Sequence, residues 1–252
     1  MRFLHAWSGG KDSTAGIILN HINNLPPLTI IFSEVMFDNS RNISGELPEH
    51  MKFIREQAIP IFDSWGYETK ILHSPKDYME LFFHVVKRSK TPENIGKHSG
   101  WLIGGRCAAN RDLKVKPINE FCKSIGREYM QYIGIASDEP KRIERLTENK
   151  ESLLVRYGYT EQMAYELCKS YGLLSPIYET CHRGGCWFCP NQPYRDFANL
   201  KQMHPELWNE LKKLSSTPDL ISRGFRYGVS FSEVERKVDE IISKRESQQM
   251  NC

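Results

Sequence analysis

The stretch SGGKDST, Ser8–Thr14, follows the apolar run RFLHAW at residues 2–7 and precedes a segment with helical character. Two adjacent glycines allow a sharp turn that brings backbone N–H groups close to an anion. The following helix adds the positive end of its dipole, and Lys11 adds an ammonium group. Asp12 would repel phosphate unless a magnesium ion bridges the two. The stretch therefore predicts a phosphate-binding turn that uses Mg²⁺.

This turn differs from a Walker A loop, in which the first glycine stands well upstream of the lysine. Here the glycines directly adjoin Lys11, and an acidic residue separates that lysine from Ser13. A plain helix cap with a solvated Lys11 is the structural alternative. We predict a catalytic role for Lys11, Asp12 and Ser13, and nucleotide contacts for the whole turn: Ser8, Gly9, Gly10, Lys11, Asp12, Ser13 and Thr14.

Strand-like and helix-like segments alternate along the chain. The apolar and β-branched runs predict strands at 2–7, 28–37, 67–74 and 127–140. The helical periodicity predicts helices at 13–23, 47–65 (with a kink at Pro60), 77–89, 113–126, 161–173, 197–214 and 230–244. Such alternation indicates an α/β fold with a parallel sheet and helices on both faces. Ligands of these sheets bind beyond the carboxyl ends of the strands, where the glycine turn lies.

The composition is that of an ordinary globular protein, with 252 residues, 40% of them hydrophobic and 26% charged. A net charge of +3 is too small to indicate a nucleic-acid partner by itself. The N-terminal residues lack the apolar stretch of a signal peptide, and no apolar run has membrane-spanning length. We therefore expect a cytoplasmic protein without a membrane partner.

Three of the seven cysteines gather in CHRGGCWFC, at Cys181, Cys186 and Cys189. Such clustering in an intracellular chain favours a metal or iron–sulfur centre over disulfides. Four thiolates suit an iron–sulfur cluster or a tetrahedral zinc ion, and the C-x-x-C spacing does not distinguish them. An unmetallated set of buried cysteines is the remaining alternative. Cys168 or His182 would substitute for a missing ligand.

SGGKDS matches the S-G-G-x-D-S signature of the PP-loop (N-type) ATP pyrophosphatase superfamily. Three later segments resemble the phosphoadenosine phosphosulfate (PAPS) reductase-like branch, which includes the sulfur-transfer ATPases of DNA phosphorothioation: CAANRDLKVKPINEF (107–121), YIGIASDEPKRIERL (132–146) and GGCWFCPNQ (184–192). The resemblance implies an adenine nucleotide α-hydrolase-like sheet of five parallel strands, with a small cysteine-rich helical C-terminal region. We place the PP-loop domain at 1–176 and that C-terminal region at 177–252.

The resemblance also implies a reaction. ATP would be cleaved to AMP and pyrophosphate, AMP would be attached to an acceptor oxygen, and a sulfur nucleophile would displace it. The branch further implies that Cys107 lies near the later cysteines, although Ala108 replaces a second cysteine of the branch. The expected cofactors are ATP, Mg²⁺ and a 4Fe–4S cluster, with zinc as the alternative, on Cys107, Cys181, Cys186 and Cys189.

Charged residues outside the turn add further candidates. Arg106, Arg111 and Lys114 either bind a substrate phosphate or sulfate or form a solvated helix face. Asp138 binds magnesium or ribose at the end of the fourth predicted strand, or pairs with a neighbouring cation. The stretch ISRGFRYG at 221–228 either contacts nucleic acid or is a solvated turn.

Two other functions compete with the sulfur-transfer reading. A PAPS or APS reductase is disfavoured because the loop is intact and no Glu-Cys-Gly segment occurs. A non-catalytic nucleic-acid-binding module with a structural zinc site is also disfavoured, because the SGGKDS loop is intact. The expected partners are ATP, a sulfur donor such as a cysteine desulfurase or sulfide, and an acceptor that is either a nucleic acid or a small molecule. Assembly as a homo-oligomer is left open.

Overall fold

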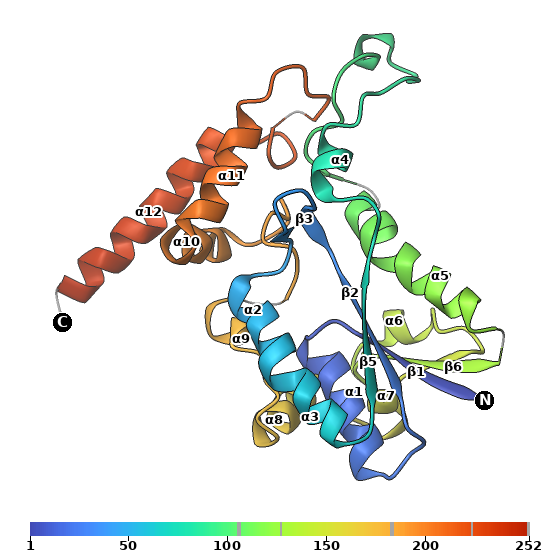
Figure 1. Ribbon diagram of the computed structural model, residues 1–252. Helices are drawn as coiled ribbons and strands as arrows, with labels where there is room; N and C mark the ends of the chain where they lie inside the picture. The colour runs from blue at the N-terminus through green and yellow to red at the C-terminus, as the bar shows by residue number, and fades with distance from the viewer. Residues whose placement is uncertain (105–106, 127, 182–183, 223, 251–252) are drawn as a thin grey trace.

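A five-stranded parallel sheet forms the centre of the molecule (Figure 1), as expected for the α/β fold class. The computed structural model describes residues 1–104, 107–126, 128–181, 184–222 and 224–250. The strands lie in the order β5-β2-β1-β6-β7, and each pairs in parallel with its neighbours. Their bounds are β1 (Arg2–Trp7), β2 (Thr29–Glu34), β5 (Glu68–His73), β6 (Tyr129–Ile133) and β7 (Lys150–Glu151).

Helices cover both faces of this sheet because the central strands are apolar on both sides. In β1, Trp7 points into a large apolar cluster that also contains α1 (Lys11–Ile22) and α8 (Glu161–Ser170). Leu4 points to the opposite face, where it packs with Cys122 of α5 (Lys116–Ser124). The alternation along β1 therefore divides the core into two layers.

The remaining elements connect and extend this framework. A small antiparallel pair, β3 (Met36–Asp38) and β4 (Ile43–Ser44), follows β2. The other helical segments are α2 (Pro48–Lys52), the π-helix η1 (Phe53–Ala58), α3 (Ile59–Ser64), α4 (Tyr78–Phe82), the 3₁₀ turn η2 (Pro92–Asn94), the π-helix η3 (Ala109–Val115), α6 (Pro140–Ile143), α7 (Leu153–Arg156), α9 (Ile177–Thr180), α10 (Tyr194–Met203), α11 (Pro205–Ser215) and α12 (Phe231–Met250).

Several predicted bounds were wrong. The helix expected at 77–89 ends at Phe82, and the chain then runs out into an extended projection that pairs Val85 with His98. Helical turns continue from 48 to 64, with a π-helical segment directly before Pro60. Proline lacks an N–H, and the change of hydrogen-bond pattern accommodates it there. The helix expected at 197–214 divides at His204, before Pro205.

A second apolar cluster lies beside the sheet and contains the C-terminal helices. Trp187, Phe197 and Trp208 meet residues from much earlier in the chain there, such as Phe37 and Trp101. This cluster draws on both sides of the predicted boundary at 176/177, and the division into two domains stays a prediction.

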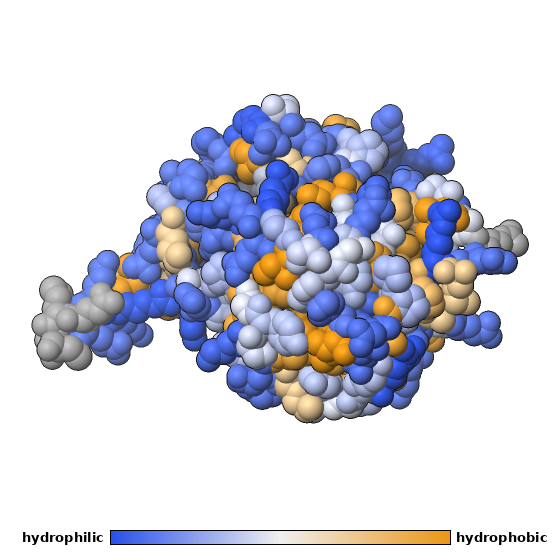
Figure 2. All heavy atoms as spheres, turned by 60° about the horizontal axis from the view of Figure 1, so that its bottom comes forward, coloured by the Kyte–Doolittle hydropathy of each residue, from blue (hydrophilic) through white to orange (hydrophobic). Residues whose placement is uncertain are grey.

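The surface is largely hydrophilic on the face shown in Figure 2, with apolar residues in small separate areas. Across the described ranges, no helix combines the length and the apolar character needed to cross a membrane.

Candidate functional site

The glycine turn is closed by hydrogen bonds among its own residues. Gly9 has a φ of +72°, which favours glycine, and α1 begins two residues later at Lys11. Ser13 Oγ donates to the carbonyl oxygen of Gly10 at 3.0 Å and accepts from the backbone N–H of Ser8 at 3.2 Å. The Ser8 and Ser13 hydroxyl oxygens lie 3.1 Å apart. The backbone of the turn is thus held in a fixed shape before any ligand binds.

His50 supports the turn from behind. Its Nε2 lies 3.2 Å from the carbonyl oxygen of Ser8, and its Nδ1 lies 2.8 Å from Oγ of Ser175. A Cβ atom at Gly9 would lie 2.5 Å from the imidazole carbon Cε1 of His50. Burial lowers the pKa of His50, so the ring is neutral at pH 7. Only glycine leaves room for this ring against the turn.

Gly134, which follows β6, brings a second backbone segment against the turn. A Cβ atom at Gly134 would lie 2.4 Å from the backbone nitrogen of Ser13 and 2.6 Å from its Cα. Neither atom can move without displacing the start of α1. The end of β6 and the start of α1 therefore form one continuous surface.

Lys11 lies between two carboxylates. Its Nζ contacts Asp12 Oδ1 at 2.7 Å and Glu161 Oε2 at 3.0 Å. Burial opposes the charged ammonium, but the hydrogen bonds to Asp12 and Glu161 outweigh it and raise the pKa of Lys11. Burial raises the pKa of Asp12, and the ion pair with Lys11 only partly offsets this. A bound polyphosphate would compete with both carboxylates for the ammonium.

Tyr178 occupies the N-terminal end of α1. Its hydroxyl oxygen accepts a hydrogen bond from the backbone N–H of Lys11 at 2.8 Å. That N–H is one of the donors that a helix N-terminus offers to an anion. Burial raises the pKa of Tyr178, so its hydroxyl stays protonated. The backbone N–H of Lys11 is thus held by a neutral side chain from α9.

A cavity of about 220 Å³ lies in front of the turn. Gly10, Asp12 and Ser13 line it from the turn, and Gly134, Lys114 and Arg142 line it from other segments. A larger cavity of about 870 Å³ lies on the other side of Asp12 and Tyr178. Its lining includes Lys11, Glu139, Arg142, Glu161 and Cys181.

Not all predicted nucleotide contacts reach these cavities. Thr14 is fully buried and accepts a hydrogen bond from the indole N–H of Trp7 at 2.9 Å. Arg111 is exposed and pairs with the neighbouring Asp112. Asp138 accepts a hydrogen bond from the backbone N–H of Glu161, and it lines neither cavity. Arg106 lies outside the described residues, as does His182.

Three of the predicted metal ligands line one cavity of about 380 Å³: Cys107, Cys186 and Cys189. Burial raises the pKa of Cys186 well above its ordinary range, so the isolated thiol is protonated. Cys181 instead lines the larger nucleotide-side cavity with Lys11 and Asp12. Among the described residues, no three His, Cys, Asp or Glu side chains converge as a metal site. The four cysteines therefore do not form a preassembled ligand set.

The cysteine cavity and the cavity in front of the turn share a wall. Gly184 and Gly185 line both of them. The following Trp187 fixes this segment, because its indole N–H donates to the carbonyl oxygen of Ser44 at 2.8 Å. Two segments remote in sequence, around Cys107 and around Cys186, thus bring thiols close to the glycine turn.

Sequence reasoning missed several residues of the site. His50, Tyr178 and Glu161 were assigned no role, since each is a single residue far from the turn in sequence. Arg142, which was not singled out, contacts Glu139 at 2.7 Å and lines both the cavity in front of the turn and the larger one. The one available signal was its position just after the end of the strand predicted at 127–140.

No protein-family profile and no curated protein matches the sequence. Among solved structures, the chain is similar in fold to a crystal structure of phosphoadenylyl-sulfate (PAPS) reductase from Candida auris in complex with phosphate. The TM-score is 0.47 and the sequence identity is 10%, over 74% of this chain and 82% of that chain.

Proposed function

We propose that the protein is an ATP pyrophosphatase-type enzyme of the PP-loop, PAPS reductase-like kind, which adenylates an acceptor and then replaces AMP with sulfur. The observation that supports this most directly is the wall shared by two cavities. Gly184 and Gly185 separate a phosphate-binding turn from a cavity lined by three cysteines. This arrangement supports a reaction in which ATP cleavage and sulfur transfer occur next to each other.

In the first step, an acceptor oxygen attacks the α-phosphorus of ATP, and the bond from that phosphorus to the pyrophosphate oxygen breaks. The free backbone donors at the start of α1 and the ammonium of Lys11 would hold the departing pyrophosphate. Asp12 lines both the cavity in front of the turn and the larger one, and its carboxylate would hold Mg²⁺. Magnesium supplies positive charge that stabilises the leaving group.

In the second step, a sulfur nucleophile attacks the atom that bears the adenylated oxygen. That carbon–oxygen or phosphorus–oxygen bond breaks, and AMP leaves with the oxygen. Hydrosulfide balances this step without any further reductant. A cysteine desulfurase would instead supply a persulfide, whose outer sulfur attacks and displaces AMP, and a second thiol would then cleave the remaining S–S bond, releasing the thiolated acceptor and leaving a disulfide. The acceptor is a nucleic acid or a small molecule with an activatable oxygen.

For the cysteines, we propose an iron–sulfur cluster on Cys107, Cys186 and Cys189, with zinc as the alternative. Three thiols in one cavity support such a site. Cys181, the fourth predicted ligand, faces the nucleotide side, so we route no reaction step through the metal. Anaerobic purification followed by iron, sulfide and zinc analysis decides between the two.

The deciding experiment measures the products of ATP cleavage by the anaerobically purified protein, with sulfide and candidate acceptors present. We expect AMP and pyrophosphate in equal amounts. Release of ADP and phosphate would rule out attack at the α-phosphorus. Consumption of PAPS with release of sulfite would instead identify a sulfonucleotide reductase.

Cysteine variants then separate the two steps. Cys186→Ser should abolish sulfur incorporation while pyrophosphate release stays within about threefold, because the thiol lies on the far side of the shared wall from the turn. Cys181→Ser tests the thiol on the nucleotide side in the same assay. Cys122→Ala is the matched control, since Cys122 is buried with Leu4 and Ile31 on the other face of the sheet. Loss of sulfur incorporation in that control would contradict the assignment.

A further inference from the structure

A strongly basic projection extends from the molecule beyond α4. Residues 84–98, which we call the basic arm, run out and back as two antiparallel segments (Figure 1), with η2 at the tip. Backbone hydrogen bonds join the segments, from Val86 N–H to the carbonyl of Lys97 at 3.0 Å and from Gly96 N–H to that of Val86 at 2.9 Å. The arm is therefore a defined ribbon.

The charge of the arm is unbalanced. It contains four cations, Lys87, Arg88, Lys90 and Lys97, and one acid, Glu93, so its net charge is 4 − 1 = +3. The whole chain also carries a net charge of +3, so the remainder is balanced. Among the described residues, none of the four cations forms an ion pair, and the first three are exposed.

A second segment extends the same surface. His98 N–H donates to the carbonyl of Asp219 at 2.9 Å, and Ile221 N–H donates to that of His98 at 2.8 Å. This segment continues to Arg226, whose guanidinium lies 4.7 Å from the ring centroid of Tyr194, and to Tyr227, which is 89% exposed. Cations and an exposed aromatic ring thus occur together beside the arm.

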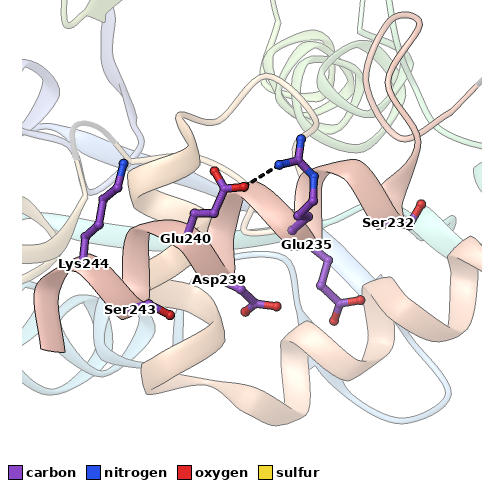
Figure 3. A pocket seen from close by; sticks show the side chains of 7 residues that line it. Ser232, Glu235, Asp239, Glu240, Ser243 and Lys244 are labelled. Carbon is purple, nitrogen blue, oxygen red and sulfur yellow. Dashed lines mark hydrogen bonds and ion pairs between the residues drawn. The ribbon is translucent and has the colours of Figure 1, made fainter. Parts of the chain in front are cut away.

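The charges on α12 are arranged differently. The shallow groove along that helix (Figure 3) presents both signs, and Glu240 pairs with Arg236 across one turn. Glu235 pairs with Lys201 at 3.4 Å and with Lys212 at 3.2 Å. These cations are neutralised by neighbours, whereas those of the arm are not. The arm is the feature that would attract a polyanion.

Both ends of the arm continue into segments that line the cysteine cavity. Phe82, just before the arm, packs edge-on against Trp101, shortly after it, with ring centroids 5.1 Å apart. Tyr78 and Leu102, further along each end, line the cavity that contains Cys186. The base of the arm is therefore joined to the wall of this cavity.

We propose that the basic arm is a docking surface for nucleic acid. Its cations bind the phosphodiester backbone, and Arg226 and Tyr227 offer a cation and a ring to an unpaired base. An anionic membrane would also be attracted to the cations, and vesicles are therefore included in the test. The pairing of a guanidinium with an exposed ring favours nucleic acid, because every base offers a face for stacking. The docking of nucleic acid is independent of the proposed function. The further step, that the docked strand is also the acceptor, rests on the proposed function.

The test is fluorescence anisotropy with a labelled 20-nucleotide single-stranded DNA, without ATP, between 50 and 200 mM salt. The triple variant Lys87→Ala, Arg88→Ala, Lys90→Ala loses three phosphate contacts. We expect the slope of log affinity against log salt to fall by about 2, and the affinity at 0.1 M salt to fall by roughly 100-fold. The matched control Lys123→Ala, Lys169→Ala, Lys244→Ala removes the same charge elsewhere and should keep wild-type affinity.

Two results would overturn the docking surface: no binding by the wild type at 50 mM salt, or equal losses in both triple variants. Phosphatidylserine vesicles are the second probe, and arm-dependent binding to vesicles without binding to DNA would assign the arm to membranes. Pyrophosphate release is measured separately on the same preparations. Intact ATP cleavage without DNA binding contradicts only the docking surface, and DNA binding without ATP cleavage contradicts only the proposed function.

Discussion

The glycine turn and the cysteine cavity are neighbours, but they are built in opposite ways. The turn is one continuous stretch, closed by its own hydroxyls and supported by His50 and Gly134. The cysteine cavity combines residues around 78, 107 and 186, and its thiols do not converge. The backbone of the turn already has a fixed shape. The cavity is lined by three cysteines, but their side chains are not arranged as a complete set of metal ligands.

The difference shows how each kind of site is specified. A local turn needs a few residues of fixed conformation, so its rigidity is encoded in short sequence. A site assembled from remote segments depends on the packing of aromatic rings such as Phe37, Tyr78 and Phe188 around it. Substitutions should therefore affect the two regions separately, which the following predictions test.

The largest effect is expected from Gly134→Val. Its Cβ would lie 2.4 Å from the backbone nitrogen of Ser13, so the start of α1 must move. We expect a loss of roughly 4 kcal/mol of folding free energy or more, and no measurable ATP binding. Thermal unfolding and nucleotide titration measure the two effects. Gly66→Ala, where no atom lies within 4 Å of the added Cβ, is the control. Normal ATP binding by Gly134→Val would mean that the turn is not held from β6.

Asp12→Asn should lower the rate of pyrophosphate release by roughly 100- to 1,000-fold, as expected for the loss of one electrostatic contact to the leaving group. The folding free energy should change little, because the amide keeps the shape of the side chain. Sulfur transfer from a chemically adenylated acceptor should be retained. An unchanged rate of pyrophosphate release would place the phosphate site elsewhere.

Acid should destabilise the sheet beneath the turn. Burial lowers the pKa of His5 to about 4, and neither ring nitrogen has a hydrogen-bond partner among the described residues. Below pH 6.5 the imidazole of His5 binds a proton in the unfolded chain but stays neutral in the folded chain. The free energy of unfolding therefore decreases as the pH falls. The contribution of His5 between pH 6.5 and 4 is roughly 3 kcal/mol.

Urea unfolding of wild type and His5→Leu at pH 7 and pH 4.5 measures this contribution. The variant should lose less stability on acidification than the wild type. His73→Gln is the control, because His73 is half exposed and pairs with Glu34. Parallel losses in wild type and His5→Leu would show that other groups govern the acid response.

Gly45→Ala should act on the cysteine region alone. The added Cβ would lie 2.7 Å from the carbonyl oxygen of Val35 and 2.9 Å from a ring carbon of Phe188. We expect about 2 kcal/mol of destabilisation, or a fall in Tm of roughly 4–8 °C. Sulfur incorporation should fall while pyrophosphate release is kept. Equal losses of both activities would mean that the two regions are not independent.

The smallest effect is expected from a substitution at Tyr178, whose hydroxyl holds the start of α1 from α9. Tyr178→Phe frees the backbone N–H of Lys11 for a phosphate oxygen. We expect pyrophosphate to bind a few-fold more tightly by calorimetry, with about 1 kcal/mol lost from the folding free energy. Weaker binding would show that the hydroxyl itself contacts phosphate.

The turn, the fold class and four of the five strands were predictable because each depends on local pattern. The segment β7 was not, since Lys150–Glu151 is too short to show alternation. Residues 84–89 of the arm were expected to continue the helix at 77–89, because their apolar residues match helical spacing, whereas the structure pairs Val85 with His98. His50 and Tyr178 escaped notice because their partners lie 42 and 167 residues away.

The shared wall at Gly184 and Gly185 has a consequence for the order of events. Glycines present only backbone, so the part of the wall that these two residues form carries no side chain. Adenylated acceptors are readily hydrolysed, and one that escaped into solvent would waste its ATP. In the proposed reaction, the adenylated acceptor formed at the turn moves past the backbone of Gly184 and Gly185 to reach the cavity that contains the cysteine thiols. The protein would then commit ATP and sulfur to the same molecule without releasing it.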